Sequence, residues 1–176
     1  MNQTSSKLPL FLLIFLSTYV LFYTTCINKN YQTDTPHKNI YTNPIKEKGI
    51  EPWAIFHEGE YFYTEGYEDR IKLWRTKDLT DISNAESIDA WLPKDKSNAY
   101  HLWGPEIHFI NNKWYIYFAA DDGYTDNHQI YVVENQSPNP FEGEFIMKGR
   151  IQTDKDNNWA IHADVFQHQN ELYMIW

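Results

Sequence analysis

The sequence predicts an all-β protein made of β-propeller blades, of which about two and a half are present. Three observations carry this prediction. A strand-turn-strand pattern recurs three times along the chain, and aromatic and β-branched residues dominate on both sides of each turn, as strands require. The three copies begin at Pro52, Pro105 and Ala163, so they are spaced by 53 and 58 residues, near the period of propeller repeats.

Each copy is a predicted hairpin whose turn residues tolerate a positive φ angle. The hairpins cover residues 52–64, 105–117 and 163–175, and their turns are Glu58-Gly59, Asn111-Asn112 and Gln169-Asn170. The first two copies continue into a third strand, at 70–75 and 129–134, and residues 143–148 are a candidate fourth, outer strand of the second copy. Four-stranded units at this spacing favour propeller blades. The alternative is a plain β-sandwich of hairpins.

The N-terminal region predicts export. Residues Leu8 to Thr25 contain no charged side chain and follow Lys7, as in an export signal, although an uncleaved signal anchor fits the same pattern. Cys26 directly follows this run and resembles the lipidated cysteine of bacterial lipoproteins, which would tether the protein to a membrane; an incidental cysteine is the alternative. We therefore divide the chain into a signal (1–26), a flexible tether (27–43) and the folded part (44–176), outside the cytoplasm.

Composition limits the partners and the covalent cross-links that this chain can have. The formal net charge of −9 repels phosphate backbones, so nucleic acid is not an expected partner. A single cysteine excludes an intramolecular disulfide. Because the chain stops within the apolar run Tyr173 to Trp176, with no turn after it, we expect it to be a fragment.

Several motifs together resemble glycoside hydrolase family 43, the arabinofuranosidases, arabinanases and β-xylosidases. They are Asn43-Pro44-Ile45, Pro52-Trp53, Asp69-Arg70-Ile71, Leu102-Trp103-Gly104-Pro105-Glu106-Ile107-His108-Phe109, Lys113-Trp114-Tyr115-Ile116-Tyr117-Phe118-Ala119-Ala120, Tyr131-Val132-Val133-Glu134-Asn135 and Trp159-Ala160-Ile161. The resemblance covers residues 43–176 and implies a five-bladed propeller. It also implies an inverting hydrolase that acts on arabinose- or xylose-containing polysaccharides and oligosaccharides.

The resemblance further implies three acidic catalytic groups, because inversion needs an acid and a base that flank the sugar with room for a water. The family's general base, an Asp before a Pro, falls on Glu51, and its second Asp, which orients the general acid, falls on His162. The general acid itself is a Glu of the fourth blade, beyond Trp176. The residue directly before each predicted hairpin is Glu51 in the first copy, Gly104 in the second and His162 in the third; we call this position the slot of the repeat. Because the three residues are equivalent in the repeat, we expect them to converge around one axis.

Three further residues are candidates for the site. Asp164 lies two residues after His162, so in an extended strand both side chains face the same way. Asp164 then supplies the missing charge, or His162 hydrogen-bonds a neighbouring acid. Alternatively, Asp164 caps a turn and His162 is an ordinary polar residue. Trp103 and His101 precede the second hairpin, where an indole face stacks on a sugar and an imidazole hydrogen-bonds it.

No cofactor is expected within this chain. Its seven histidines include no pair at zinc-site spacing with a third ligand, and the resemblance implies calcium only in the complete domain, through residues of later blades. The function predicted from the sequence is glycoside hydrolysis. The alternative is a non-catalytic carbohydrate-binding propeller, since the two family aspartates that fall within the chain are replaced.

Overall fold

The computed structural model describes residues 41–176. The predicted signal, Cys26 and residues 27–40 of the predicted tether lie outside the described residues. Within residues 41–176, none of the helices has the length and apolar character needed to span a bilayer.

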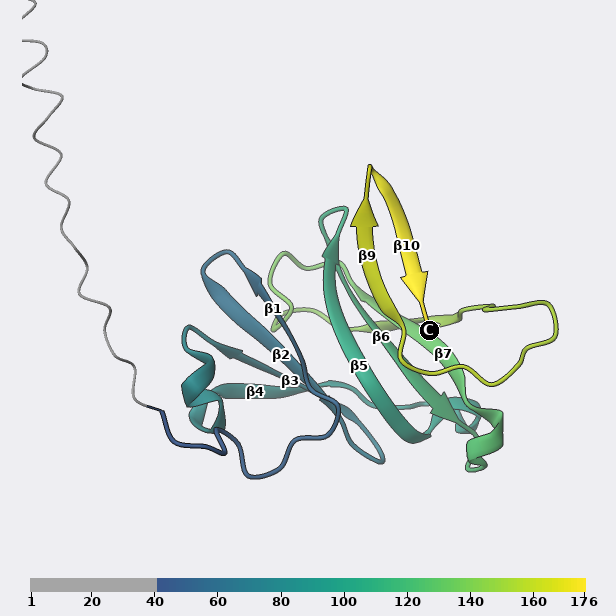
Figure 1. Cartoon of the computed structure of the whole chain (residues 1–176), viewed down its shortest axis with the longest axis horizontal. Coiled ribbons are helices and arrows are strands. Elements are labelled where there is room, and N and C mark those ends of the chain that lie inside the picture. The colour runs from purple at the N-terminus through teal and green to yellow at the C-terminus, as the bar shows by residue number, and fades with distance from the viewer. Residues whose placement is uncertain (1–40) are drawn as a thin grey trace, which may run out of the picture. The chain divides into compact units, whose positions relative to one another are not determined.

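The described residues form two four-stranded antiparallel sheets and a separate hairpin, which follow one another along the chain (Figure 1). The first sheet contains β1 (Trp53–His57), β2 (Glu60–Gly66), β3 (Ile71–Thr76) and β4 (Glu86–Trp91), in that order. The second contains β5 (Tyr100–Ile110), β6 (Lys113–Asp121), β7 (Gln129–Asn135) and β8 (Ile146–Arg150), and the hairpin contains β9 (Asp164–His168) and β10 (Glu171–Ile175). Three short 3₁₀ helices, η1 (Leu79–Asn84), η2 (Lys96–Asn98) and η3 (Thr125–Asn127), lie in the connections. Each sheet is a meander of neighbouring strands, which confirms the two predicted blades and the half blade.

The predicted hairpin turns are confirmed. Both residues of each turn have positive φ, between 47° at Gln169 and 87° at Gly59. The outer strand of the second sheet, β8, begins three residues later than the sequence suggested and pairs with β7. The third strands lie within one residue of their predicted positions.

The two sheets share one core. Leu73 of β3, Ile107 of β5 and Ile116 of β6 are completely buried in the same apolar cluster. Burial of one such side chain stabilises the fold by about 1.5–3 kcal/mol. Thr64 donates its hydroxyl proton to the carbonyl oxygen of Pro105 over 2.6 Å, which joins β2 directly to β5.

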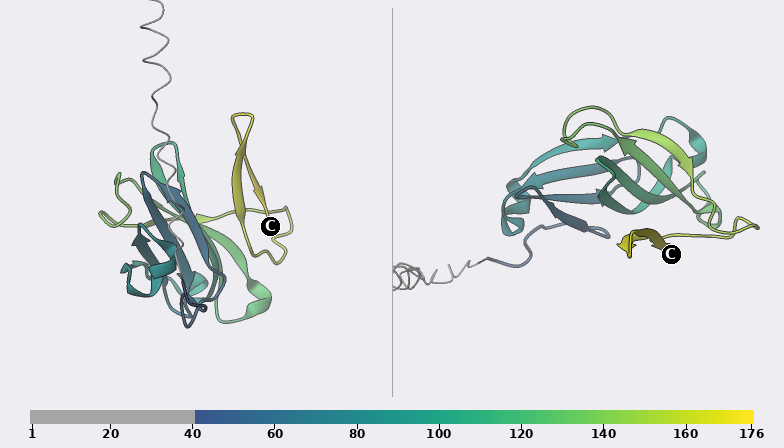
Figure 2. Two further views of the ribbon diagram at one scale, coloured as in Figure 1. Left: turned by 60° about the vertical axis from the view of Figure 1, so that its left-hand side comes forward. Right: turned by 90° about the horizontal axis from the view of Figure 1, so that it is seen from above.

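The third hairpin packs more sparsely. Ala160 and Ala163, just before β9, are buried against Ile130 of β7. Leu172 and Tyr173 of β10 are about half exposed. Figure 2 shows this hairpin, in yellow, at the margin of the described strands.

Candidate functional site

The three residues that occupy the same slot in the repeat share an unusual backbone. Glu51, Gly104 and His162 have φ values of +47°, +49° and +55°. This left-handed region is unfavourable for residues with a Cβ atom. Each chain segment therefore turns sharply at the same point as it enters its blade, and the turn re-aims the side chain.

The same three residues contact one another, as the repeat predicts. The Gly104 backbone N–H donates to Glu51 Oε2 over 2.7 Å, and His162 Nε2 lies 3.4 Å from Glu51 Oε1. A Cβ atom at residue 104 would lie 3.1 Å from His162 Nδ1, so any larger residue would have to displace the His162 side chain slightly, and the φ angle itself favours glycine. One carboxylate thus joins the entry segments of three successive repeats.

The Glu51 carboxylate remains open to water. Its side chain is 33% exposed and that of His162 is 53% exposed. The amide of Gly104 holds one carboxylate oxygen, while the other keeps capacity to accept a proton. An anchored, water-accessible carboxylate beside an imidazole has the geometry of a general base.

The sequence argument for Asp164 is wrong in its premise. His162 has a positive φ angle and lies outside the strand that begins at Asp164, so strand alternation does not relate their side chains. Within residues 41–176, no hydrogen bond or ion pair joins Asp164 to Glu51 or His162. The acid that neighbours His162 is Glu51, whose Oε1 lies 3.4 Å from Nε2, at ion-pair distance but without the geometry of the hydrogen bond that the sequence alternative expected. The proposed catalytic roles of Glu51, His162 and Asp164 stay predictions.

Trp103 and His101 lie in the first part of β5, where the pairing with β6 shifts register twice. These bulges bend the strand and re-aim its side chains. His101, with φ +50°, places Nδ1 2.8 Å from Asp121 Oδ2, and its side chain is 29% exposed. The ring of Trp103 is half-buried and stacks on His128 at a centroid distance of 4.2 Å.

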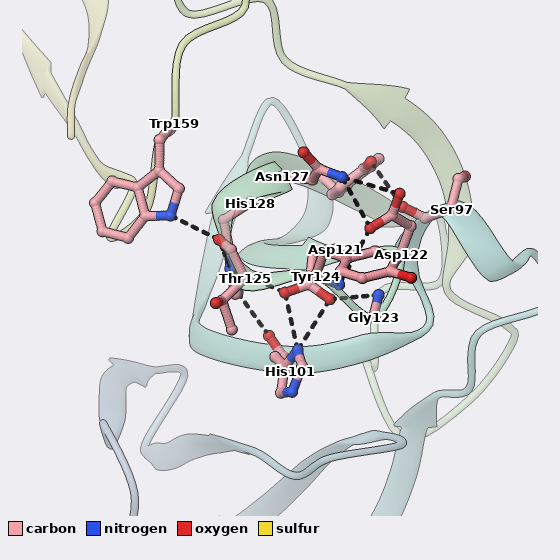
Figure 3. A network of polar contacts seen from close by, with 11 residues as sticks. Ser97, His101, Asp121, Asp122, Gly123, Tyr124, Thr125, Asn127, His128 and Trp159 are labelled. Carbon is pink, nitrogen blue, oxygen red and sulfur yellow. Dashed lines mark hydrogen bonds and ion pairs between the residues drawn. The ribbon is translucent and has the colours of Figure 1, made fainter.

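Sequence reasoning missed Asp121 and His128, the two completely buried members of this network (Figure 3). His128 Nδ1 lies 3.0 Å from Asp121 Oδ2, and the Gly123 N–H donates to Asp121 Oδ1 over 2.8 Å. Both residues belong to segments whose sequence looks like ordinary strand ends, and no motif spacing links them to His101. Only the meander of β5, β6 and β7 brings the three together.

The described residues contain no group of three His, Cys, Asp or Glu side chains arranged to hold a metal ion.

Comparison with known proteins agrees with the family that the sequence motifs resemble. Residues 41–176 match the family model of glycosyl hydrolases family 43. The chain is 33% identical over 148 residues to an extracellular exo-α-(1→5)-L-arabinofuranosidase of Streptomyces chartreusis, covering 80% of this chain and 44% of that protein. A protein of the same description from Streptomyces avermitilis is 35% identical over 144 residues, which cover 77% of this chain and 29% of the relative. The chain thus spans less than half the length of these relatives.

Solved structures agree with the fold. The α-L-arabinofuranosidase of Lactobacillus brevis superimposes with a TM-score of 0.70 at 30% identity, covering 76% of this chain and 45% of that one. An α-L-arabinanase of Cellvibrio cellulosa, crystallised with arabinohexaose, gives a TM-score of 0.56 at 17% identity over 73% of this chain and 44% of its own. Together with the two complete four-stranded sheets, these similarities identify the fold as part of a five-bladed propeller.

Proposed function

The chain belongs to glycosyl hydrolases family 43, and we propose that its protein hydrolyses glycosidic bonds of arabinose-containing polysaccharides or oligosaccharides, outside the cytoplasm. Two relatives are described as extracellular arabinofuranosidases, which supports both the sugar and the location. Xylosides are a second group of substrates in this proposal, because the family resemblance includes β-xylosidases.

One observation carries the proposal: the Glu51 carboxylate is fixed by the Gly104 N–H and stays accessible to water. In an inverting mechanism this carboxylate removes a proton from the water that attacks the anomeric carbon. Glu51 is one methylene longer than the aspartate of the family pattern. The left-handed backbone at Glu51 and the amide of Gly104 together determine where that longer side chain places its oxygens.

His162 is the second group of the proposed mechanism. Its Nε2 lies 3.4 Å from Glu51 Oε1, so an N–H at this position stabilises the ionised carboxylate until the water is bound. The general acid belongs to a later blade, according to the family resemblance. Trp103 and His101 bind the sugar, by stacking and by a hydrogen bond from a hydroxyl group.

The test is the substitution Glu51→Gln in the full product of the gene that encodes this chain. Gln keeps an oxygen that accepts from the Gly104 N–H but cannot take a proton from water. Because a general base contributes about 100-fold to 10,000-fold, hydrolysis of aryl arabinofuranosides and xylosides should fall by that factor with sugar binding nearly intact. The matched control, Glu58→Gln in the exposed turn at the other end of β1, should keep its full rate.

A non-catalytic carbohydrate-binding propeller is the second candidate, favoured by the engagement of both Glu51 oxygens by Gly104 and His162. In that case wild type and Glu51→Gln turn over every pentoside at the background rate, while calorimetry shows oligosaccharide binding that Trp103→Ala abolishes. Glu51→Asp separates the two further. Shortening the side chain slows a working base but does not slow a protein that has no hydrolytic rate.

A further inference from the structure

We propose that His128 is a positioning residue: it carries a proton on both ring nitrogens, and this imidazolium fixes Asp121 and Trp103 and, through Asp121, the tautomer of His101. The part that concerns sugar binding rests on the proposed function above. The protonation and tautomer assignments rest only on the contacts in Figure 3.

Every polar neighbour of the His128 ring is a hydrogen-bond acceptor. Nε2 lies 3.1 Å from the carbonyl oxygen of His101, and Nδ1 lies 2.9 Å from the carbonyl oxygen of Thr125 and 3.0 Å from Asp121 Oδ2. A carbonyl oxygen cannot donate, so each ring nitrogen must carry a proton to avoid two facing lone pairs. The ring is completely buried, so water does not replace either partner.

The charge balance of the network agrees with this assignment. The Asp121 carboxylate is also completely buried and accepts from the Gly123 N–H. A buried carboxylate requires a charged or strongly donating partner. The groups that face His128 are Asp121 from β6, His101 and Trp103 from β5, the Thr125 carbonyl, and the Trp159 indole, whose N–H donates to that same carbonyl oxygen. Asp121 is the only one of these with a negative charge, and the imidazolium neutralises it.

Asp121 in turn sets the tautomer of His101. Both carboxylate oxygens lie within 2.9 Å of His101 Nδ1, so Nδ1 carries the proton and Nε2 keeps its lone pair. Because Nε2 lies across the ring from Nδ1, it points away from Asp121, and the side chain is 29% exposed. His101 is thereby prepared to accept a hydrogen bond from a sugar hydroxyl.

His128 also contacts the second proposed sugar-binding residue. The rings of His128 and Trp103 are stacked with an interplanar angle of 24°. A cationic ring against an indole face is attracted by the ring quadrupole. One face of Trp103 is therefore held by His128, which leaves the other face for the sugar.

The test is nuclear magnetic resonance of the chain labelled with ¹⁵N in histidine, at neutral pH and without sugar. A long-range ¹H–¹⁵N spectrum should show His128 with two protonated nitrogens and His101 with a protonated Nδ1 and an unprotonated Nε2. Triple-resonance assignment of the wild type identifies both rings even if a variant fails to fold. The exposed His168 of β9 is the internal reference. A single protonated nitrogen on His128 would overturn the proposal.

Two variants test the connection between the residues. In Asp121→Asn the carboxylate that accepts from His101 Nδ1 is lost, so His101 should no longer be held in one tautomer. In His128→Gln of the full product of the gene, affinity for an arabino-oligosaccharide should fall by up to about tenfold, the value of one hydrogen bond, while circular dichroism stays unchanged. Unchanged affinity in a folded His128→Gln would refute the positioning role. If the spectra are as expected but the full wild-type product binds no sugar, the proposed function fails and the protonation assignment stands.

Discussion

Outside the hairpin turns, left-handed backbone at residues that carry side chains includes three residues of the candidate site. Glu51 and His162 adopt φ values of +47° and +55° where the first repeat begins and just before β9, and His101 adopts +50° within the bulged start of β5. Each such residue costs roughly 1–2 kcal/mol relative to a right-handed conformation. The fold keeps this cost where Glu51 meets His162 and where His101 meets Asp121, and functional sites often contain such strained residues.

The substitution His162→Gly tests whether the left-handed backbone at residue 162 lowers the stability of the fold. Glycine adopts positive φ without penalty, and the half-exposed His162 contributes little packing, so stability should rise by about 1 kcal/mol. The matched control is His168→Gly within β9, where glycine should lower stability by about 0.5–1 kcal/mol. Urea denaturation of both variants measures the two signs. A loss of stability in both would mean that His162 is not strained.

The residues at the repeated position before each hairpin could be predicted because the pattern recurs. Asp121 and His128 could not, because neither position recurs. Glu51, Gly104 and His162 could be aligned from the sequence because each precedes the same hairpin pattern. Asp121 ends β6 and His128 lies between η3 and β7, in only one of the repeats, so no alignment within the chain points to them. Their contact depends on the antiparallel pairing of β6 with β7, which the sequence predicts only in outline.

At the level of elements, β2 and β5 are the strands that bring the first two sheets together. Gly66 at the end of β2 lies so close to the backbone of β5 that an added Cβ atom would be 1.9 Å from the Leu102 carbonyl oxygen. The hairpins and third strands followed from alternation and turn residues. The early start of β5 at Tyr100 did not, because its two register shifts interrupt the alternation that marks a strand.

The substitution Gly66→Ala should therefore force the two sheets apart. We expect a loss of about 3 kcal/mol, at the upper end of overpacking effects, because the neighbour is backbone and cannot rotate away. The control is Gly59→Ala in the first hairpin turn, where no atom lies within 4 Å and only the positive φ angle of 87° is unfavourable, so about 1 kcal/mol is expected. Thermal unfolding of both variants measures the difference. Equal losses would contradict a steric role for Gly66.

At the level of the whole molecule, burial decreases from the second sheet to the third hairpin. All seven residues of β7 are buried, whereas β10 has four exposed residues of five. In repeat architectures each unit is stabilised mainly by its neighbours. The third hairpin contacts a neighbouring repeat through Ala160, Ala163 and Met174, against Ile130 and Tyr117. The His162 side of the candidate site is therefore attached to the most weakly packed repeat among the described residues.

Hydrogen exchange of this chain should reveal that gradient. Amides of β10 should exchange through local opening, which needs little free energy where few apolar contacts are lost, and amides of β7 should exchange only on global unfolding. Mass spectrometry of exchanged peptides, one covering residues 164–175 and one covering 129–135, makes the comparison within a single sample. The turn at Asn111-Asn112 is the control for an exposed segment between well-packed strands. Equal protection of the two peptides would mean that the third hairpin is held by contacts as strong as those of the second sheet. Faster exchange in 164–175 would mean that the third hairpin opens locally while the second sheet stays folded.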